Sequence, residues 1–288
     1  MLGFNGGLIG QDRTTSSLAA IGVWTLDEQI KARRNGIWPG AGDIDANNYI
    51  AAVESSTGDN QALEDATKAA IQAFVQGCKN DGIWDAIKAS CILAGARTLA
   101  GALKPLKGTA PTNAGNLFVA GDYNRKTGLV GNGSTKYLDS NRNNNADPQD
   151  SKHLAVWLSE IGSTSGKAVM GATFAAGTSG FYLGTSTTTN TRINTNASDT
   201  LTATLLANNL LGASRSSSTV TRRFNASSNT LSSASQSPGS SNIFVFAESP
   251  GSFHATSRIA FYSIGESIDL ALLDARVATL ITAIGAAF

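Results

Sequence analysis

The sequence predicts an α+β protein in which an N-terminal extended arm and a small helical segment precede an antiparallel β-sandwich that ends in one C-terminal helix. Three observations predict this order. Apolar residues recur at helical spacing over residues 43–103, short β-prone runs alternate with Gly, Asn, Ser and Thr clusters beyond Pro111, and an amphipathic pattern returns over residues 267–284. We therefore divide the chain into three parts, residues 1–40, 41–110 and 111–288.

The N-terminal part reads as an arm that carries one short helix. Residues 1–23 are Gly-rich and polar without a sustained period, which indicates an extended segment. Thr25, with Glu28 three residues later, forms a capping-box pattern ahead of residues 26–34. Acidic residues open this stretch and basic residues close it, as the helix dipole favours, and residues 38–40 (Trp-Pro-Gly) end it.

The middle part predicts three helices. Asp43 can cap the first, which residues 55–58 (Ser-Ser-Thr-Gly) interrupt. The second follows a 3.6-residue period over residues 63–77. Asp81 can cap the third, whose apolar residues over 83–98 are spaced by 4, 4, 3 and 4.

The C-terminal part predicts many short strands about 8–12 residues apart, the spacing of a sandwich or barrel. Only six charges lie between Ile161 and Ser241, so the polar strand faces are hydroxyl and amide faces. The candidate strands are residues 117–120, 127–130, 135–138, 153–158, 168–174, 181–184, 205–214, 219–225, 230–233, 242–246 and 257–264. A final helix over residues 267–284 can line one side with Ile268, Leu272, Ala275 and Leu280.

The charge balance argues against a dedicated nucleic-acid binder. Lys and Arg number 22 and Asp and Glu number 21, so the net charge is +1 and no basic excess exists. Cys78 and Cys91 both lie in apolar sequence that predicts helix, which favours buried thiols over a disulfide framework. No uninterrupted apolar run of membrane-spanning length and no signal-peptide pattern occur, so we expect no membrane insertion and no export signal.

Three runs in the C-terminal part carry a resemblance to a known fold family. They are residues 131–138 leading into 153–158, residues 212–217 with 223–225, and residues 258–268. Together they resemble the concanavalin A-like lectin (laminin-G-like) jelly rolls found in many phage proteins, over residues 115–288. The resemblance implies a jelly-roll sandwich, and its motifs are poorly specific for a ligand.

A second, shorter resemblance lies in residues 22–29 (Gly-Val-Trp-Thr-Leu-Asp-Glu-Gln) and 37–39 (Ile-Trp-Pro). It is similar to an element that recurs in virion and tail-associated proteins of tailed phages, ahead of unrelated C-terminal domains. The resemblance implies attachment to the particle, a virion location after assembly in the host cytoplasm, and other virion proteins as partners. The docking candidates are Phe4, Trp24, Leu26 and Trp38.

Residues 43–54 fit the calcium-loop pattern D-x-[DN]-x-[DN]-G-x₅-E except that Asn48 replaces the Gly. The flanks do not supply the two helices of an EF-hand, so we expect a capped short helix and no metal site. Residues 128–136 lack the Gly-Lys-Ser/Thr order of a phosphate loop. We expect no cofactor.

The sequence offers no catalytic constellation that stands out. A G-x-S-x-G elbow is absent, and neither His153 nor His254 lies in a context that marks a general base. Glu160 and Glu248 stand alone, whereas a retaining glycosidase needs two carboxyls about 5–5.5 Å apart. We expect no catalytic residue and no enzyme, with a glycan depolymerase kept as an alternative because distant carboxyls can converge.

An Asn-rich stretch supplies the ligand-binding candidates, Asp139, Asn141, Arg142, Asn143 and Asn145. A loop of this composition at one end of a jelly roll could bind a sugar or a hard cation, although Asn and Asp also form ordinary turns. Trp157 either stacks on a sugar or belongs to the core.

These observations predict a phage virion structural protein, a tail fibre, tail-associated protein or head appendage. It would display a lectin-like domain that binds host-surface glycan or a neighbouring virion protein. A homo-oligomer is expected, with a trimer favoured. The alternatives are a capsid or tail decoration protein whose sandwich binds no sugar, and a depolymerase.

Overall fold

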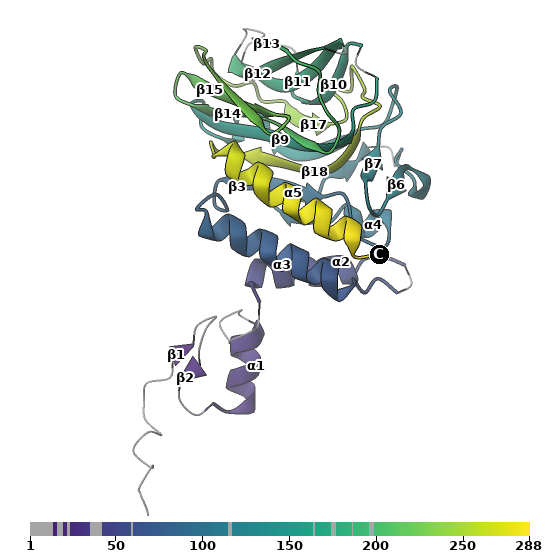
Figure 1. The fold of residues 1–288 in the computed structure, drawn as a ribbon, viewed down its shortest axis with the longest axis vertical. Helices are drawn as coiled ribbons and strands as arrows, with labels where there is room; N and C mark the ends of the chain where they lie inside the picture. Colours follow the sequence, from purple (N-terminus) through teal and green to yellow (C-terminus); the bar gives the residue numbers. More distant parts are fainter. Residues whose placement is uncertain are drawn as a thin grey trace, which may run out of the picture.

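The computed structural model describes residues 14–15, 20–21, 24–34, 42–58, 60–114, 117–163, 165–173, 177–185, 187–195 and 199–288. Its body has three layers: a seven-stranded sheet, a nine-stranded sheet and a layer of helices beneath it (Figure 1). The predicted α+β class, with an antiparallel sandwich and a C-terminal helix, is confirmed. No helix in the described ranges has the length and apolar character needed to cross a membrane.

Both sheets pair antiparallel throughout. The nine-stranded sheet has the order β16-β15-β14-β9-β18-β3-β4, and β7 and β6 continue from β18. Its strands are β3 (Ile87–Ile92), β4 (Pro105–Lys107), β6 (Tyr123–Asn124), β7 (Gly128–Val130), β9 (Ser151–Glu160), β14 (Asn209–Ser216), β15 (Thr219–Phe224), β16 (Ser227–Ser232) and β18 (Arg258–Gly265). The seven-stranded sheet has the order β13 (Asp199–Thr202), β12 (Thr188–Thr195), β11 (Thr178–Thr185), β10 (Lys167–Gly171), β17 (Asn242–Val245), β8 (Leu138–Asn143) and β5 (Thr112–Asn113).

The centre of the nine-stranded sheet is buried on both faces, and alternation along β9 shows why. Leu154, Val156 and Leu158 point into the core between the two sheets. Ala155 and Trp157 point into the core between the sheet and the helices. Because successive side chains of a strand point to opposite faces, one strand supplies both cores. Trp157 is therefore a core residue rather than a surface for stacking a sugar.

The helical layer consists of α2 (Ile44–Glu54), α3 (Asp65–Asn80) and α5 (Leu270–Ala286), with the short α4 (Leu99–Ala102) at its edge. Asp43 caps α2 as predicted, because its Oδ1 accepts from the backbone N–H of Asp45 at 2.9 Å. Phe74 of α3 meets Phe261 of β18 edge-to-face, with ring centroids 5.6 Å apart, and this contact joins the helices to the sheet.

The N-terminal helix α1 (Leu26–Arg34) has the bounds that the sequence predicts. Its capping box forms, because Glu28 Oε2 accepts from both the backbone N–H and the hydroxyl of Thr25 at 2.8 Å. Two two-residue strands, β1 (Thr14–Thr15) and β2 (Ala20–Ile21), pair with each other. The rest of the predicted arm, including residues 38–40, lies outside the described residues.

The third predicted helix, over residues 83–98, is wrong. Residues 87–92 form β3, which lies between β18 and β4. Ile87 and Ile92 face the helices, whereas Ala89 and Cys91 face the other sheet. β3 is short, and although Lys88 and Ser90 alternate with its apolar residues, the apolar residues over 83–98 also match helical spacing, so periodicity did not distinguish the two. Cys78 and Cys91 are free and buried, although Cys91 lies on this strand and not on a helix.

Other strand predictions shift or fail. Residues 117–120 form no strand and lead into a 3₁₀ turn (Ala120–Asp122). β12 and β13 were not predicted, and β8 occupies residues that were expected to be a loop. The sheet also crosses the boundary expected at residue 110, since β3 and β4 precede it.

Candidate functional site

The Asn-rich stretch is built into the sandwich. Asp139, Asn141 and Arg142 lie on β8, and a 3₁₀ turn (Asn144–Ala146) follows. Asn242 Nδ2 on the neighbouring β17 donates to both oxygens of the Asp139 carboxylate at 3.0 Å. Asn141 takes a left-handed φ of 56° and donates to the carbonyl oxygen of Ala110 at 2.8 Å. These polar groups therefore bind other parts of the chain.

Arg142 belongs to a charge cluster at the end of the sandwich core. Its guanidinium pairs with the Asp147 carboxylate, and Arg142 Nε donates to Asp147 Oδ2 at 3.1 Å. The fully buried Lys152 lies 3.5 Å from the same oxygen and donates to the carbonyl of Asn144 at 2.8 Å. Burial lowers the pKa of Lys152 to about 8, and Asp147 opposes that shift. This cluster closes the polar end of the core.

Asn143 and Asn145 are the remaining candidates, and both are exposed. The structure thus brings Asp139, Asn141 and Arg142 into internal contacts and leaves Asn143 and Asn145 at the surface. The ligand-binding role of all five stays a prediction. Sequence reasoning missed Asp147 and Lys152 as members of the cluster, and a lysine that begins a buried strand was the available signal.

His153 is paired with a serine that the sequence does not place near it. His153 Nε2 lies 2.7 Å from Ser263 Oγ, and His153 Nδ1 lies 2.5 Å from the carbonyl oxygen of Glu266. Both side chains are fully buried between β9 and β18. Burial lowers the pKa of His153 to about 4, so the ring is neutral at pH 7. A serine hydroxyl and a histidine ring can act as nucleophile and base, but this pair is not accessible from the surface. Its role is to provide hydrogen-bond partners for buried polar groups.

The calcium-like residues 43–54 hold a lysine instead. Lys79 Nζ of α3 lies 2.8 Å from Asp43 Oδ2 and 2.7 Å from Asp45 Oδ2. Burial alone would lower the pKa of Lys79, but its hydrogen bonds with the two carboxylates outweigh burial and raise it. An ammonium group therefore occupies the place where a cation would bind, and the predicted capped helix is confirmed.

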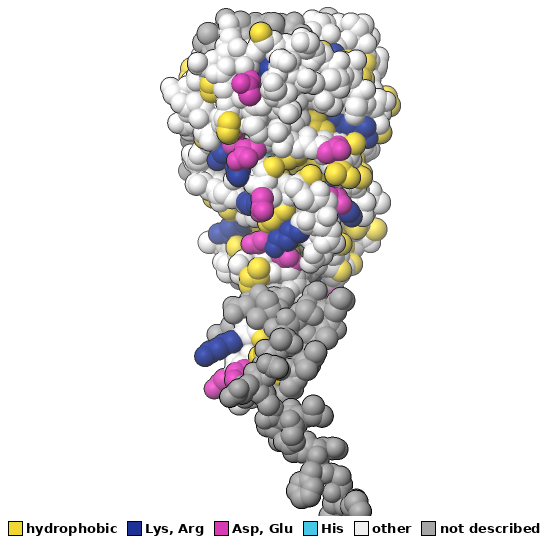
Figure 2. All heavy atoms as spheres, turned by 90° about the vertical axis from the view of Figure 1, so that its left-hand side faces the viewer, with side chains coloured by type: hydrophobic (Ala, Val, Ile, Leu, Met, Phe, Trp, Pro, Cys, Tyr) yellow, Lys and Arg dark blue, Asp and Glu magenta, His cyan; other side chains and the backbone are white. Residues whose placement is uncertain are grey.

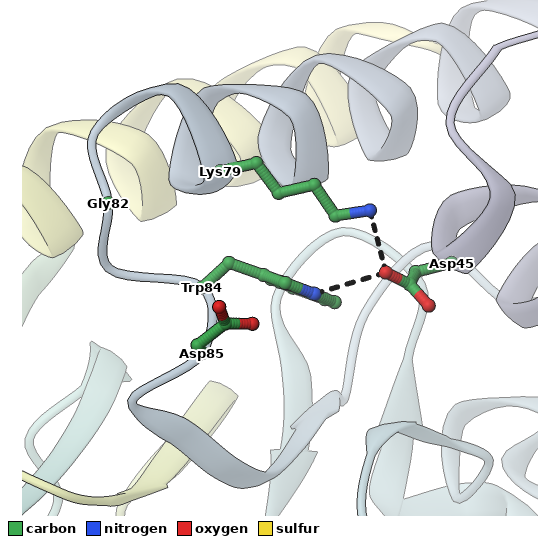
Figure 3. A pocket seen from close by; sticks show the side chains of 5 residues that line it. All are labelled: Asp45, Lys79, Gly82, Trp84 and Asp85. Carbon is green, nitrogen blue, oxygen red and sulfur yellow. Dashed lines mark hydrogen bonds and ion pairs between the residues drawn. The ribbon is translucent and has the colours of Figure 1, made fainter. Parts of the chain in front are cut away.

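A hollow of about 350 Å³ opens beside this ion pair and is lined by Asp45, Lys79, Gly82, Trp84 and Asp85 (Figure 3). Trp84 Nε1 donates to Asp45 Oδ2 at 3.1 Å. Lys107 Nζ lies 4.6 Å from the centre of the Trp84 ring, which is a cation–π contact. The Trp84 ring and the Lys79 ammonium group thus already have partners within the chain. The Asp85 carboxylate, by contrast, is fully exposed at this hollow.

A second hollow of about 290 Å³ lies on the helix-facing side of the nine-stranded sheet, beyond the start of α5. Hydroxyl groups make most of its wall. It is lined by Ser214, Ser216, Thr219, Thr221, Ser267, Ile268 and Asp269. Neutral hydroxyls with one carboxylate suit a ligand that both donates and accepts hydrogen bonds, such as a polyol or a sugar ring.

The two isolated glutamates stay apart from both hollows. Glu160 pairs with Arg258 at 2.9 Å. Glu248 is buried and hydrogen-bonded to Tyr182; burial, and then this carboxylate, raise the pKa of Tyr182. Of the docking candidates, Trp24 is half-buried and Leu26 is 71% exposed. Phe4 and Trp38 lie outside the described residues.

Comparison with known proteins gives similarity to solved structures alone; no protein-family model and no curated sequence matches. A mutant of the NanB sialidase from Streptococcus pneumoniae is 16% identical, with a TM-score of 0.41, over 52% of this chain and 27% of that one. A Trypanosoma rangeli sialidase mutant displaying trans-sialidase activity is 9% identical, with a TM-score of 0.44, over 73% and 39%. A mutant GH54 α-L-arabinofuranosidase is 13% identical, with a TM-score of 0.38, over 55% and 41%. The chain thus spans less than half the length of each.

The expectation that the protein is not an enzyme is contradicted to this extent: the solved structures similar to this chain include sialidases and arabinofuranosidases. Similarity of this extent gives this chain no reaction and no catalytic residue. The β-sandwich itself rests on the strand pairing described above.

Replacing Arg142 by Ala leaves the buried Asp147 with Lys152 as its remaining charged partner. We expect the free energy of unfolding in urea to fall by about 2–3 kcal/mol, because an under-compensated buried carboxylate is costly. The matched Asn145→Ala change removes an exposed side chain and should cost about 0.5 kcal/mol or less. Equal stability of the two variants would contradict the structural role assigned to the cluster.

Stability should also fall on acidification because of His153. Between pH 6.5 and pH 4 the unfolded chain binds a proton at this ring that the folded chain does not, so the free energy of unfolding decreases as pH drops through this window. The contribution is about 3 kcal/mol. Urea titrations at pH 7 and pH 4.5 measure it, and His153→Gln should reduce the difference. An NMR titration that shows the His153 ring of the folded protein charging above pH 6 would refute the assignment.

Proposed function

We propose that the protein is a virion component of a tailed phage, attached through its N-terminal segment and displaying the sandwich to bind host glycan or a neighbouring virion protein. The observation that carries this proposal is the position of α1. In Figure 1, α1 and the β1–β2 pair lie below the body, away from α2 and α3. A helix outside the body is available to a partner.

The surface of α1 supports attachment. Leu26 is 71% exposed and Ile30 is 38% exposed, and the two lie four residues apart on one side of the helix. Fully burying such side chains contributes about 1.5–3 kcal/mol each. The capping box of Thr25 and Glu28 stabilises the start of α1 without help from the body. Partner proteins of the particle are therefore proposed to cover this side.

The displayed surface supports binding of a neutral, hydroxyl-rich ligand. Figure 2 shows charged side chains gathered over the lower half of one face, whereas the upper half is mostly uncharged. The hollow lined by Ser214, Thr219 and Thr221 is the candidate site for a glycan ring. A homo-oligomer, with a trimer favoured, is part of the proposal.

Attachment is tested with the double change Leu26→Gln and Ile30→Gln, which keeps good helix formers but removes the apolar side chains. Quantitative mass spectrometry of purified particles should then show at least about tenfold less protein, a factor that corresponds to about 1.4 kcal/mol. Lys31→Ala, on the same helix, is the control and should leave incorporation unchanged. Normal incorporation of the double variant would reject docking through α1.

Glycan binding is tested by removing hydroxyls without changing side-chain shape. Thr219→Val and Thr221→Val together should weaken binding on a glycan array at least about tenfold, since each lost hydrogen bond contributes about 0.5–1.5 kcal/mol. Thr202→Val, on the exposed part of β13, is the matched control. A full chain that binds no glycan would favour the decoration protein without sugar binding, and release of sugar from host envelope would favour the depolymerase.

A further inference from the structure

The nine-stranded sheet ends in an open edge strand. β16 pairs with β15 on one side and terminates the strand order. Five of its six residues are exposed, and Leu231 is half-buried against the core between the sheets. β16 therefore presents backbone groups to solvent along its full length.

The hairpin geometry fixes which groups face outward. Asn225 and Ala226 have φ values of 47° and 56°, as in a two-residue type I′ turn, so the flanking Phe224 and Ser227 form a hydrogen-bonded pair. Hydrogen-bonded and non-hydrogen-bonded pairs alternate along an antiparallel ladder. The N–H and C=O groups of Ser228, Thr230 and Ser232 therefore point away from β15. Their side chains share the face of β15 that carries Thr221, whose hydroxyl lies 3.2 Å from that of Thr230.

The other described sheet edges carry features that discourage pairing, and β16 does not. β4 contains Pro105 and Lys107 and is preceded by Lys104. β13 is four residues long and begins with Asp199, and β5 and β6 are each two residues long. Proline, lysine, inward charge and short length are the usual means by which edge strands avoid association. The sequence Ser-Ser-Asn-Thr-Leu-Ser of β16 has none of them.

The occupant of this edge is argued from symmetry and charge. No charged residue occurs from Phe224 to Ala247, so β16 itself brings no like charges together and offers a charged partner no ion pair. Arg222 and Arg223 reach Asn229 and Ser228 from β15, and Arg223 is paired with Asp274. Antiparallel pairing of β16 with itself around Thr230 places Ser228 opposite Ser232 of the second copy, and Asn229 opposite Leu231. Every outward backbone donor then meets an acceptor, and each hydroxyl meets a hydroxyl.

We propose that β16 is a self-association surface: two copies of the chain pair antiparallel through this strand, about a two-fold axis at Thr230, and join their nine-stranded sheets into one. This pairing specifies a contact within the homo-oligomer of the proposed function. It does not depend on glycan binding or on docking through α1. This two-fold contact joins two copies of the chain whether or not the protein also forms the favoured trimer. The contact is small, so dimer formation depends strongly on protein concentration.

Cysteine cross-linking tests the register. Cα atoms of a directly opposed hydrogen-bonded pair lie about 5.5 Å apart, within disulfide range, so T230C should cross-link to itself. The chain's own Cys78 and Cys91 are both buried and do not compete. Under mild oxidation of the full chain, T230C should form disulfide dimer at least tenfold faster than T221C, one strand inward, or T202C, on exposed β13. Equal rates for the three variants would overturn the proposal.

Proline substitution tests the backbone pairing. Because the Thr230 N–H faces outward, T230P removes a donor of the intermolecular ladder and leaves the β15 ladder intact. Sedimentation velocity over a concentration series should show dimer for the wild type and for T230A, and at least tenfold weaker dimerisation for T230P with an unchanged circular dichroism spectrum. A wild type that stays monomeric at all concentrations, or a T230P variant that dimerises normally, would refute it. If T230P unfolds, the T230C comparison decides. T230C should cross-link normally when it is combined with Leu26→Gln and Ile30→Gln. Self-association through β16 and particle attachment through α1 can therefore be refuted independently.

Discussion

The pairing of β9 with β18 is the constraint on which the rest of the structure depends. These two strands lie at the centre of the nine-stranded sheet, between two cores, and their buried apolar residues are divided between the two. A one-residue slip in their register would exchange the two sets of side chains and place Leu154 and Val156 against the helices. The same register brings His153 beside Ser263 and Trp157 beside Phe261, and thereby fixes both the buried polar pair and the contact with α3.

Local signals in the sequence were sufficient to predict the helices that begin at a capping residue. Asp43 and the Thr25–Glu28 box mark the starts of α2 and α1 because their side chains bind the first backbone donors. The same reasoning was wrong for β3. In β3 the apolar residues alternate with Lys88 and Ser90 over only six residues, and the helical spacing over residues 83–98 outweighed this short alternation. β12 is rich in Thr and was missed because threonine occurs on both the buried and the partly exposed positions of this strand, so no apolar alternation marks it.

The candidate site shows a similar limit. Composition identified Asp139, Asn141 and Arg142 as unusual but could not say that their partners are internal. Arg142 is matched by Asp147 within its own segment, whereas Asp139 is matched by Asn242, which is distant in the chain. The register of strands that are distant in the sequence determines such partners. The spacing of residues within one segment does not predict that register. The hydroxyl hollow was likewise beyond sequence reasoning, because β14, β15 and the start of α5 form it together.

The insertion of β3 between β18 and β4 has a consequence for biosynthesis. Residues 87–92 emerge from the ribosome long before residues 258–265, the strand that completes their hydrogen bonding. Neither the helical layer nor the larger sheet can finish folding until β18 and α5 have emerged, because these two elements follow every other described element in the chain. Contacts this distant in sequence slow folding and expose apolar surface meanwhile. The nascent chain must therefore remain unaggregated, alone or with a chaperone, until β18 and α5 have emerged.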